Sequence, residues 1–172
     1  MNFESFTTFS LAALGSLYLI AVAWPLSRVD IKEHRLPNRL VLPALPISLG
    51  GQLAASALSN QWLNFGISIV AGVSAFVIGL AANRWASLGM GDVKLITAIS
   101  LSLGWFSFMA PLVAIMVAFL IASLVILALF MLGKTTLGQS IALGPYLLAG
   151  FAVTQILTWS TYLGGFSPNF LM

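Results

Sequence analysis

Cysteine is absent from this sequence of 172 residues, and histidine occurs once, at position 34. A disulfide framework, a zinc site with thiolate ligands and a thiol nucleophile are therefore excluded. Charge is also scarce: 6% of the residues are charged and 60% are hydrophobic, whereas soluble domains carry about a quarter charged residues. With a mean hydropathy of +1.05, the sequence predicts an integral membrane protein.

The apolar runs have the length needed to cross a bilayer, roughly 17–25 residues. We expect an all-α, polytopic protein with about six transmembrane helices, built as a single membrane-embedded domain over residues 1–172. The first run follows Glu4 and no basic segment, so we expect it to be retained rather than cleaved as a signal peptide. Pro111 suits the first turn of the fifth helix. The expected spans are Phe9–Leu26, Leu40–Leu58, Phe65–Ala82, Leu95–Met109, Pro111–Leu132 and Ile141–Trp159.

The basic residues predict an orientation. All seven lie in the first, third and fifth connections between the expected spans. Alternate connections share one side of the membrane, and Lys and Arg mark the cytoplasmic side. Both termini are then expected outside, an N-out and C-out topology. The basic residues are Arg28, Lys32, Arg35, Arg39, Arg84, Lys94 and Lys134.

The acidic residues are few, and they limit the chemistry. Glu4 stands near the outer terminus, and the other three acids are Asp30, Glu33 and Asp92. A serine protease needs a histidine or lysine base held against its serine, and the single histidine lies in a charged connection. A zinc protease of the H-E-x-x-H type needs two histidines. Two aspartates remain as candidates for hydrolysis.

Asp30 follows the first expected span and Asp92 precedes the fourth, so both face one side and can meet. Two neighbouring carboxyl groups share one proton. The ionised group can then take a proton from water while the protonated group polarises the scissile carbonyl. Gly89 and Gly91 allow close approach of a substrate strand beside Asp92.

Each aspartate also has a purely structural interpretation. Asp92 could be the N-cap of a helix that begins at Val93, with the glycines forming the turn. Asp30 could form a surface ion pair with Arg28, Lys32 or Arg35, an arrangement that is common and weak. The functional interpretation therefore depends on the combination of the two motifs.

Two blocks resemble the type IV prepilin peptidase family, a group of GxGD aspartyl proteases. The first is Asp30 followed by Arg35-Leu36-Pro37-Asn38, and the second is Gly89-Met90-Gly91-Asp92-Val93-Lys94-Leu95. Leu143-Gly144-Pro145-Tyr146 is similar to the Gly-Pro segment of the family's last helix. The resemblance extends from about Val29 to Gly150.

The resemblance implies an aspartic endopeptidase of the cell (inner, cytoplasmic) membrane that acts at the cytoplasmic face. Asp30 and Asp92 correspond to the catalytic pair, and Gly89 and Gly91 to the glycines that shape the site. The expected partners are prepilin or pseudopilin precursors, which carry a short basic leader, usually a glycine before the cut, and then an apolar helix. Membrane lipid is expected around the protein, and no nucleic acid, cofactor or metal is expected.

Long members of the family carry an N-terminal methyltransferase region with a four-cysteine metal cluster. This sequence lacks cysteine, so we expect the short form and cleavage without N-methylation. Such short forms serve Flp-type pili or archaeal filaments.

Several further residues are candidates for binding substrate or shaping the site. Glu33 is expected to recognise the basic leader. Lys94 is expected to anchor its helix at the interface rather than to bind substrate. Pro37 and Asn38 are expected to end a loop and cap the second span. Gly144 and Pro145 are the last two candidates for binding substrate or shaping the site.

Other functions remain open at this stage. A presenilin-like GxGD protease would cut within membrane spans. A small transporter would use the two aspartates as a proton relay, although such acids more often lie in mid-span. A structural subunit would leave both motif blocks unexplained.

Overall fold

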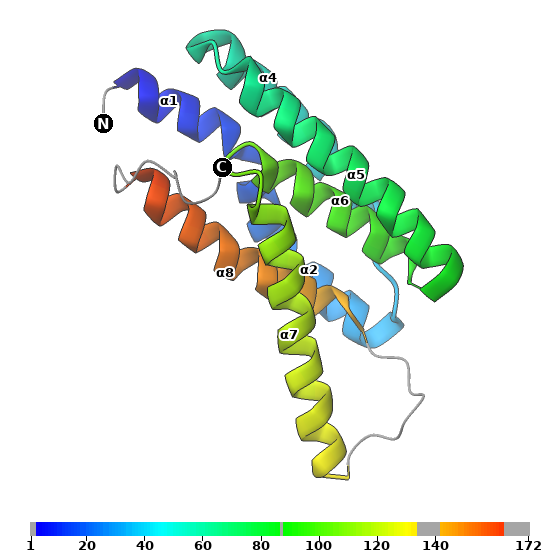
Figure 1. Ribbon diagram of the computed structural model, residues 1–172. Helices are drawn as coiled ribbons and strands as arrows, with labels where there is room; N and C mark the ends of the chain where they lie inside the picture. Colours follow the sequence, from blue (N-terminus) through cyan, green and yellow to red (C-terminus); the bar gives the residue numbers. More distant parts are fainter. Residues whose placement is uncertain (1–2, 87, 134–141, 164–172) are drawn as a thin grey trace.

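The protein is described by a computed structural model that covers residues 3–86, 88–133 and 142–163. All regular structure in these ranges is helical, which confirms the all-α prediction. Figure 1 shows the helices crossing one another as an open bundle. They are α1 (Phe3–Ala12), α2 (Leu14–Glu33), α3 (Asn38–Val41), α4 (Ala44–Ser59), α5 (Trp62–Ala86), α6 (Met90–Gly104), α7 (Ala110–Met131) and α8 (Gly144–Leu163).

Within the described ranges, four segments are long and apolar enough to cross a membrane, so the chain is a multi-pass membrane protein. They are Leu14–Glu33, Asn38–Ser59, Trp62–Ala86 and Ala110–Met131. The helices α6 and α8 are not among these four, and the count of about six spans stays a prediction. The expected start of the last span, Ile141, lies outside the described residues, as does Lys134.

The expected first span, Phe9–Leu26, is wrong in its boundaries. The α1 helix ends at Ala12 and α2 begins at Leu14, so two helices share this apolar run. Beyond Leu26, α2 continues through polar residues to Glu33. It ends at His34, whose φ of 51° is left-handed and whose backbone N–H donates to the Asp30 carbonyl. Asp30 therefore lies in the last turns of a helix, not in a connection.

The α6 helix occupies the centre of the described bundle. Its side chains Leu95, Ile99 and Leu103 are fully buried and recur at four-residue spacing, which places them on one helical face. The helix is shorter than the expected span Leu95–Met109 at its end and begins five residues earlier. Its most extensive contacts are with α5, which lies alongside it in Figure 1.

A buried polar cluster joins α4, α5 and α6. Gln52 on α4 is completely buried, and its Nε2 donates to the Leu101 carbonyl of α6 at 2.9 Å. The hydroxyl of Ser68 on α5 donates to Gln52 Oε1 at 2.7 Å. In an apolar bundle these hydrogen bonds fix the register of the three helices, because an unpaired polar group there would be costly.

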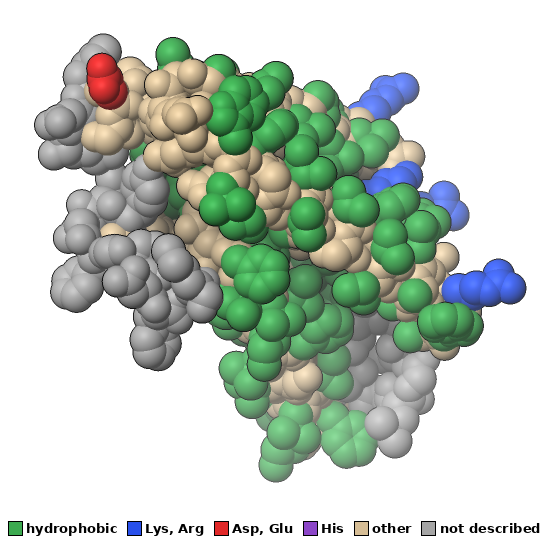
Figure 2. Space-filling view, turned by 45° about the horizontal axis from the view of Figure 1, so that its top comes forward, with side chains coloured by type: hydrophobic (Ala, Val, Ile, Leu, Met, Phe, Trp, Pro, Cys, Tyr) green, Lys and Arg blue, Asp and Glu red, His purple; other side chains and the backbone are tan. Residues whose placement is uncertain are grey.

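The molecular surface is divided by charge. Figure 2 shows a broadly hydrophobic face, with Lys and Arg at one end and an acidic side chain at the other. This separation is the distribution expected for a protein whose polar ends lie on opposite sides of a bilayer.

The contact between α7 and α8 depends on a glycine. A Cβ at Gly150 would lie 2.7 Å from the Ala118 backbone nitrogen and would also meet the Ala114 carbonyl. A Cβ at Gly66, by contrast, has nothing within 4 Å. The two backbones of α7 and α8 therefore approach as closely as small residues allow.

We predict that Gly150→Ala lowers the free energy of unfolding by about 1–3 kcal/mol, because α7 and α8 must separate to admit the methyl group. The matched control, Gly66→Ala, should be neutral or stabilising by up to about 1 kcal/mol, the helix preference of alanine over glycine. Thermal unfolding of both variants in detergent micelles measures the difference. Equal effects would contradict the proposed close contact.

Candidate active site

Asp30 is held in place by a hydrogen bond to a distant helix. Its side chain is 4% exposed, and its Oδ2 accepts the backbone N–H of Gly144 at 2.8 Å. Gly144 is the first residue of α8, so this N–H has no partner within the helix and the positive end of the helix dipole faces the carboxylate. A Cβ at Gly144 would lie 2.7 Å from Asp30 Oδ2, so the position requires glycine.

Asp92 is held by its own helix. The helix α6 begins at Met90 with Gly89 as N-cap, so the expectation that Asp92 caps a helix starting at Val93 is wrong. Asp92 is instead the third helical residue, and its carboxylate accepts the backbone N–H of Gly89. This is the returning half of a capping box, which satisfies one of the free donors at the helix start.

The two aspartates line the same two cavities. One, of about 320 Å³, we call the polar cavity. The other, of about 450 Å³, we call the apolar groove. The polar cavity is lined by Asp30, His34, Arg35, Leu36, Asn38, Gly89, Met90, Gly91, Asp92 and Lys94. The apolar groove shares Asp30, His34, Gly89 and Asp92 and adds Ala86, Leu88, Phe119, Ala122, Ser123, Ile126, Ala142, Leu143 and Tyr146.

The electrostatics of the pair are coupled. Burial, and to a smaller extent the negative charge of Asp30, raises the pKa of Asp92 to about 6. The hydrogen bond from the Gly89 N–H opposes this shift. No ion pair joins Asp30 to Arg28, Lys32 or Arg35 within the described residues, so the surface ion pair expected as an alternative does not form. The two carboxyl groups instead line the same cavities and interact electrostatically.

Three other predicted residues lie in the walls of the polar cavity. A Cβ at Gly91 would approach Leu36 Cβ to 2.8 Å, so Gly91 lets the start of α6 pack against the chain before α3. The Nζ of Lys94 donates to Asn38 Oδ1 at 2.9 Å, which ties α6 to the start of α3. Lys94 and Asn38 thus brace one another at the rim of the cavity.

The remaining predicted residues contact neither cavity. Glu33 is exposed at the end of α2. Pro37 is the N-cap residue of α3 by position and makes no side-chain capping bond, so the loop ends where we expected. Pro145 follows Gly144 in the first turn of α8, where the missing N–H of proline costs nothing. The contribution of Glu33 to leader recognition stays a prediction.

The sequence interpretation missed His34, which lines both cavities and lies near enough to Asp30 for a coulombic interaction. The available signal was spacing. His34 follows Asp30 by four residues, and residues four apart lie on one face of a helix. We had expected Asp30 in a connection, where that rule does not apply.

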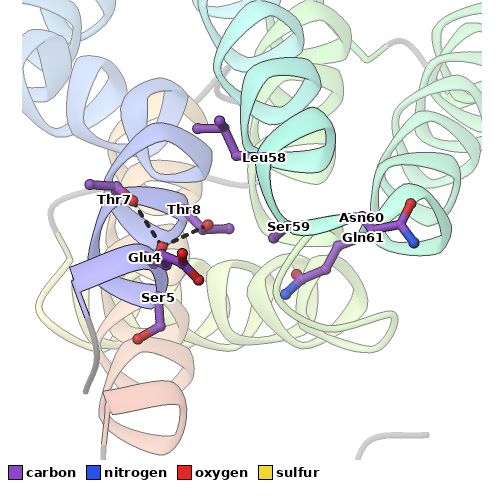
Figure 3. Close-up of a pocket in the computed structure, with 8 residues that line it drawn as sticks. All are labelled: Glu4, Ser5, Thr7, Thr8, Leu58, Ser59, Asn60 and Gln61. Carbon is purple, nitrogen blue, oxygen red and sulfur yellow. Dashed lines mark hydrogen bonds between the residues drawn. The ribbon is translucent and has the colours of Figure 1, made fainter.

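Another cavity, of about 520 Å³, lies at the start of α1 and the turn between α4 and α5 (Figure 3). The hydroxyls of Thr7 and Thr8 donate to the Glu4 backbone carbonyl at 2.8 and 2.9 Å. Glu4 is the one acid among the residues that line it, so this cavity lacks a second carboxyl group for proton exchange.

Comparison with known proteins gives a consistent family. Residues 17–132, which include both aspartates, match the family described as "Type IV leader peptidase family". Curated relatives named "Prepilin leader peptidase/N-methyltransferase" are similar over most of the chain. The protein of Pectobacterium carotovorum subsp. carotovorum is 32% identical over 155 residues, which cover 86% of this chain and 52% of the relative.

The protein of that name from Dickeya chrysanthemi is 30% identical over 169 residues, 91% of this chain and 54% of the relative. That of Burkholderia pseudomallei strain 1026b is 29% identical, over 88% of this chain and 49% of the relative. The chain therefore spans about half the length of the curated relatives it matches. No solved structure matches the chain significantly.

The coupling between the aspartates gives a testable titration. Asp30→Asn removes the neighbouring negative charge, so the pKa of Asp92 should fall below about 6 and remain above 3.8, because burial still opposes ionisation. The sequence has two aspartates, so the variant leaves a single one, and ¹³C-aspartate labelling gives a single side-chain carboxyl signal to titrate by NMR. An unchanged pKa would mean that the two carboxyl groups do not interact.

Proposed function

Because this chain belongs to the type IV leader peptidase family, we propose that it is a membrane aspartyl endopeptidase that removes the leader from prepilin or pseudopilin precursors. Asp30 and Asp92 would be the catalytic pair, within one peptidase domain formed by residues 1–172. The observation that carries the proposal is the convergence of both carboxyl groups on the same two cavities. The name of the relatives, prepilin leader peptidase/N-methyltransferase, supports prepilins as the class of substrate.

The reaction follows from the shared proton. With the pKa of Asp92 at about 6, we expect the pair to hold one proton at weakly acidic pH. The ionised carboxylate takes a proton from water as the oxygen attacks the scissile carbonyl, and the protonated carboxyl group donates to the carbonyl oxygen. Return of a proton to the leaving amine then breaks the C–N bond.

The glycines of the site would position the two aspartate carboxylates. The N–H groups of Gly144 and Gly89 each bind one of the two carboxylates, so both acids are fixed before substrate arrives. Gly91, Asn38 and Lys94 would shape the wall of the polar cavity. The transporter alternative is less well supported, because Asp30 lies in the last turns of α2 and Asp92 in the first turn of α6, rather than in mid-helix.

We further propose that the site faces the cytoplasm from the inner membrane, with both termini outside. Lys32 lies in the last turn of α2 and Arg39 in α3, and Arg35 and Lys94 line the polar cavity with Asp30. An excess of Lys and Arg is the established signal for the cytoplasmic side.

Either Asp30→Asn or Asp92→Asn should lower the rate of precursor processing by at least about 10²–10⁴-fold, the usual contribution of general acid–base catalysis. Asparagine keeps the shape of the side chain but cannot exchange the proton. Gel mobility of precursor and mature pilin in a strain that lacks its own peptidase measures the effect. Glu4→Gln, at the far cavity, is the control and should process normally. Full processing by either aspartate variant would refute the catalytic assignment.

The orientation can be tested with reporter tags. A tag at Arg84 should be cytoplasmic and a tag at Asn60 should be external, because α5 separates the two positions. Alkaline phosphatase and fluorescent protein fusions report the two sides. Signals from Arg84 and Asn60 on the same side would refute the proposed topology.

A further inference from the structure

The second half of α7 separates from the rest of the bundle. The buried residues of this helix stop at Ala122, although the helix continues to Met131. Figure 1 shows the yellow end of α7 extending away from α2 and α8. The earlier part of α7 is anchored to α8 through Ala114 and Ala118, which lie against Gly150. The apolar groove opens where this anchoring ends.

One face of α7 forms a wall of the apolar groove. Phe119, Ser123 and Ile126 are spaced by four and three residues, so they project from one side of the helix. All three are exposed, and Leu88 and Tyr146 line the groove with them. The groove reaches Asp30 and Asp92, so whatever occupies it is in contact with the catalytic pair.

Ser123 is unusual within this wall. It is the single polar residue of α7, the most apolar of the candidate spans. Several hydroxyls bond back to their own helix, as Thr97 does to the Val93 carbonyl and Ser59 to the Ala55 carbonyl, both at 2.8 Å, whereas those of Ser16, Ser100 and Thr154 have no hydrogen-bond partner in the described part of the chain. The Ser123 hydroxyl makes no such bond within the described residues. It is therefore available to a ligand in an environment where an unpaired hydroxyl is costly.

The two cavities also differ in chemistry on either side of the aspartates. His34, Arg35 and Lys94 line the polar cavity, and the groove adds mainly apolar side chains. A peptide bond held at the aspartates continues in both directions along its chain. The site thus fits the junction between a polar and an apolar segment.

We propose that the apolar groove binds the apolar helical segment that follows the scissile bond of the precursor, and that the hydroxyls of Ser123 and Tyr146 accept hydrogen bonds from its first peptide N–H groups. The residues before the bond then occupy the polar cavity. The first N–H groups of a helical segment have no partner within the helix, so acceptors in the groove strengthen its docking. The proposal rests on the proposed function and specifies its substrate contact.

The absence of cysteine allows a direct test of this contact. Ser123→Cys would be introduced into the Asp92→Asn background, so that the precursor is not consumed. The probe is a type IV prepilin carrying one cysteine, moved through the first two turns of its apolar segment, in the same reconstituted membrane. The control is Leu124→Cys, the next residue on α7, which is exposed at nearly the same depth but does not line the groove.

Disulfide formation with the precursor should be about tenfold greater for Ser123→Cys than for Leu124→Cys, and should recur with helical period along the probe. Equal cross-linking at both positions, or none at either, would overturn the proposal. The substituted side chains are small, so the test does not depend on tolerance of a bulky residue in α7.

Kinetics separate this proposal from the assignment of the reaction. Ser123→Trp fills the groove and should raise KM by about tenfold or more with kcat little changed, as expected when ground-state binding is lost. Leu124→Trp should leave both constants near those of the original chain. If processing survives in the aspartate variants, the proposed catalysis fails, while the KM difference between Ser123→Trp and Leu124→Trp still decides whether the groove binds the segment. If processing is lost there but Ser123→Trp and Leu124→Trp behave alike, the groove proposal fails alone.

Discussion

The hydrogen bond from the Gly144 N–H to Asp30 Oδ2 joins positions 114 residues apart in the chain and determines where the site can form. It requires α8 to begin beside the end of α2, and it requires glycine, because a Cβ would collide with the carboxylate and with Leu36 Cδ2 at 3.1 Å. It also stabilises a carboxylate that is almost fully buried, which would otherwise be costly in a membrane protein. The contacts between α2 and α8 and the packing of Leu36 are therefore linked to a single polar interaction.

The second aspartate, Asp92, is also stabilised by a backbone N–H at a helix start, but the helix is its own. Asp92 accepts the N–H of Gly89 at the start of its own helix, whereas Asp30 accepts the N–H of Gly144 at the start of α8. In both cases the positive end of a helix dipole, that of α6 or α8, faces a carboxylate. The Gly89 N–H thus offsets part of the burial and part of the repulsion from Asp30 that together raise the pKa of Asp92 to about 6. Removal of water around the pair makes these fixed dipoles more effective than they would be in solvent.

The sequence predicts local features well and long-range geometry poorly. The apolar runs, the start of α7 near Pro111 and the placement of Asp30 and Asp92 beside the same cavities all follow from composition and motif. The break at Ala13 does not, because no glycine or proline occupies that position and α1 and α2 form one continuous apolar run. The extension of α2 to Glu33 was missed for a related reason: a helix that leaves the apolar region keeps its backbone hydrogen bonds, so polarity does not mark its end. Because Asp30 was expected in a loop, its position four residues before His34 on one helix was not considered.

The apolar groove is harder to predict from the sequence than the helices, because it depends on the angle at which α7 diverges from α8. Alanines at positions 114, 118 and 122 predict close packing along one stripe, but nothing in the residues after Ala122 specifies how far the helix diverges. That divergence gives the aspartate pair two different surroundings, one that includes Arg35 and Lys94 and the other formed partly by α7. The proposed hydrolysis at such a boundary requires that the site admit water while it holds the proposed apolar segment. Placing the carboxyl groups at helix ends, with the polar cavity on one side, meets both requirements without exposing an unpaired charge to the lipid core.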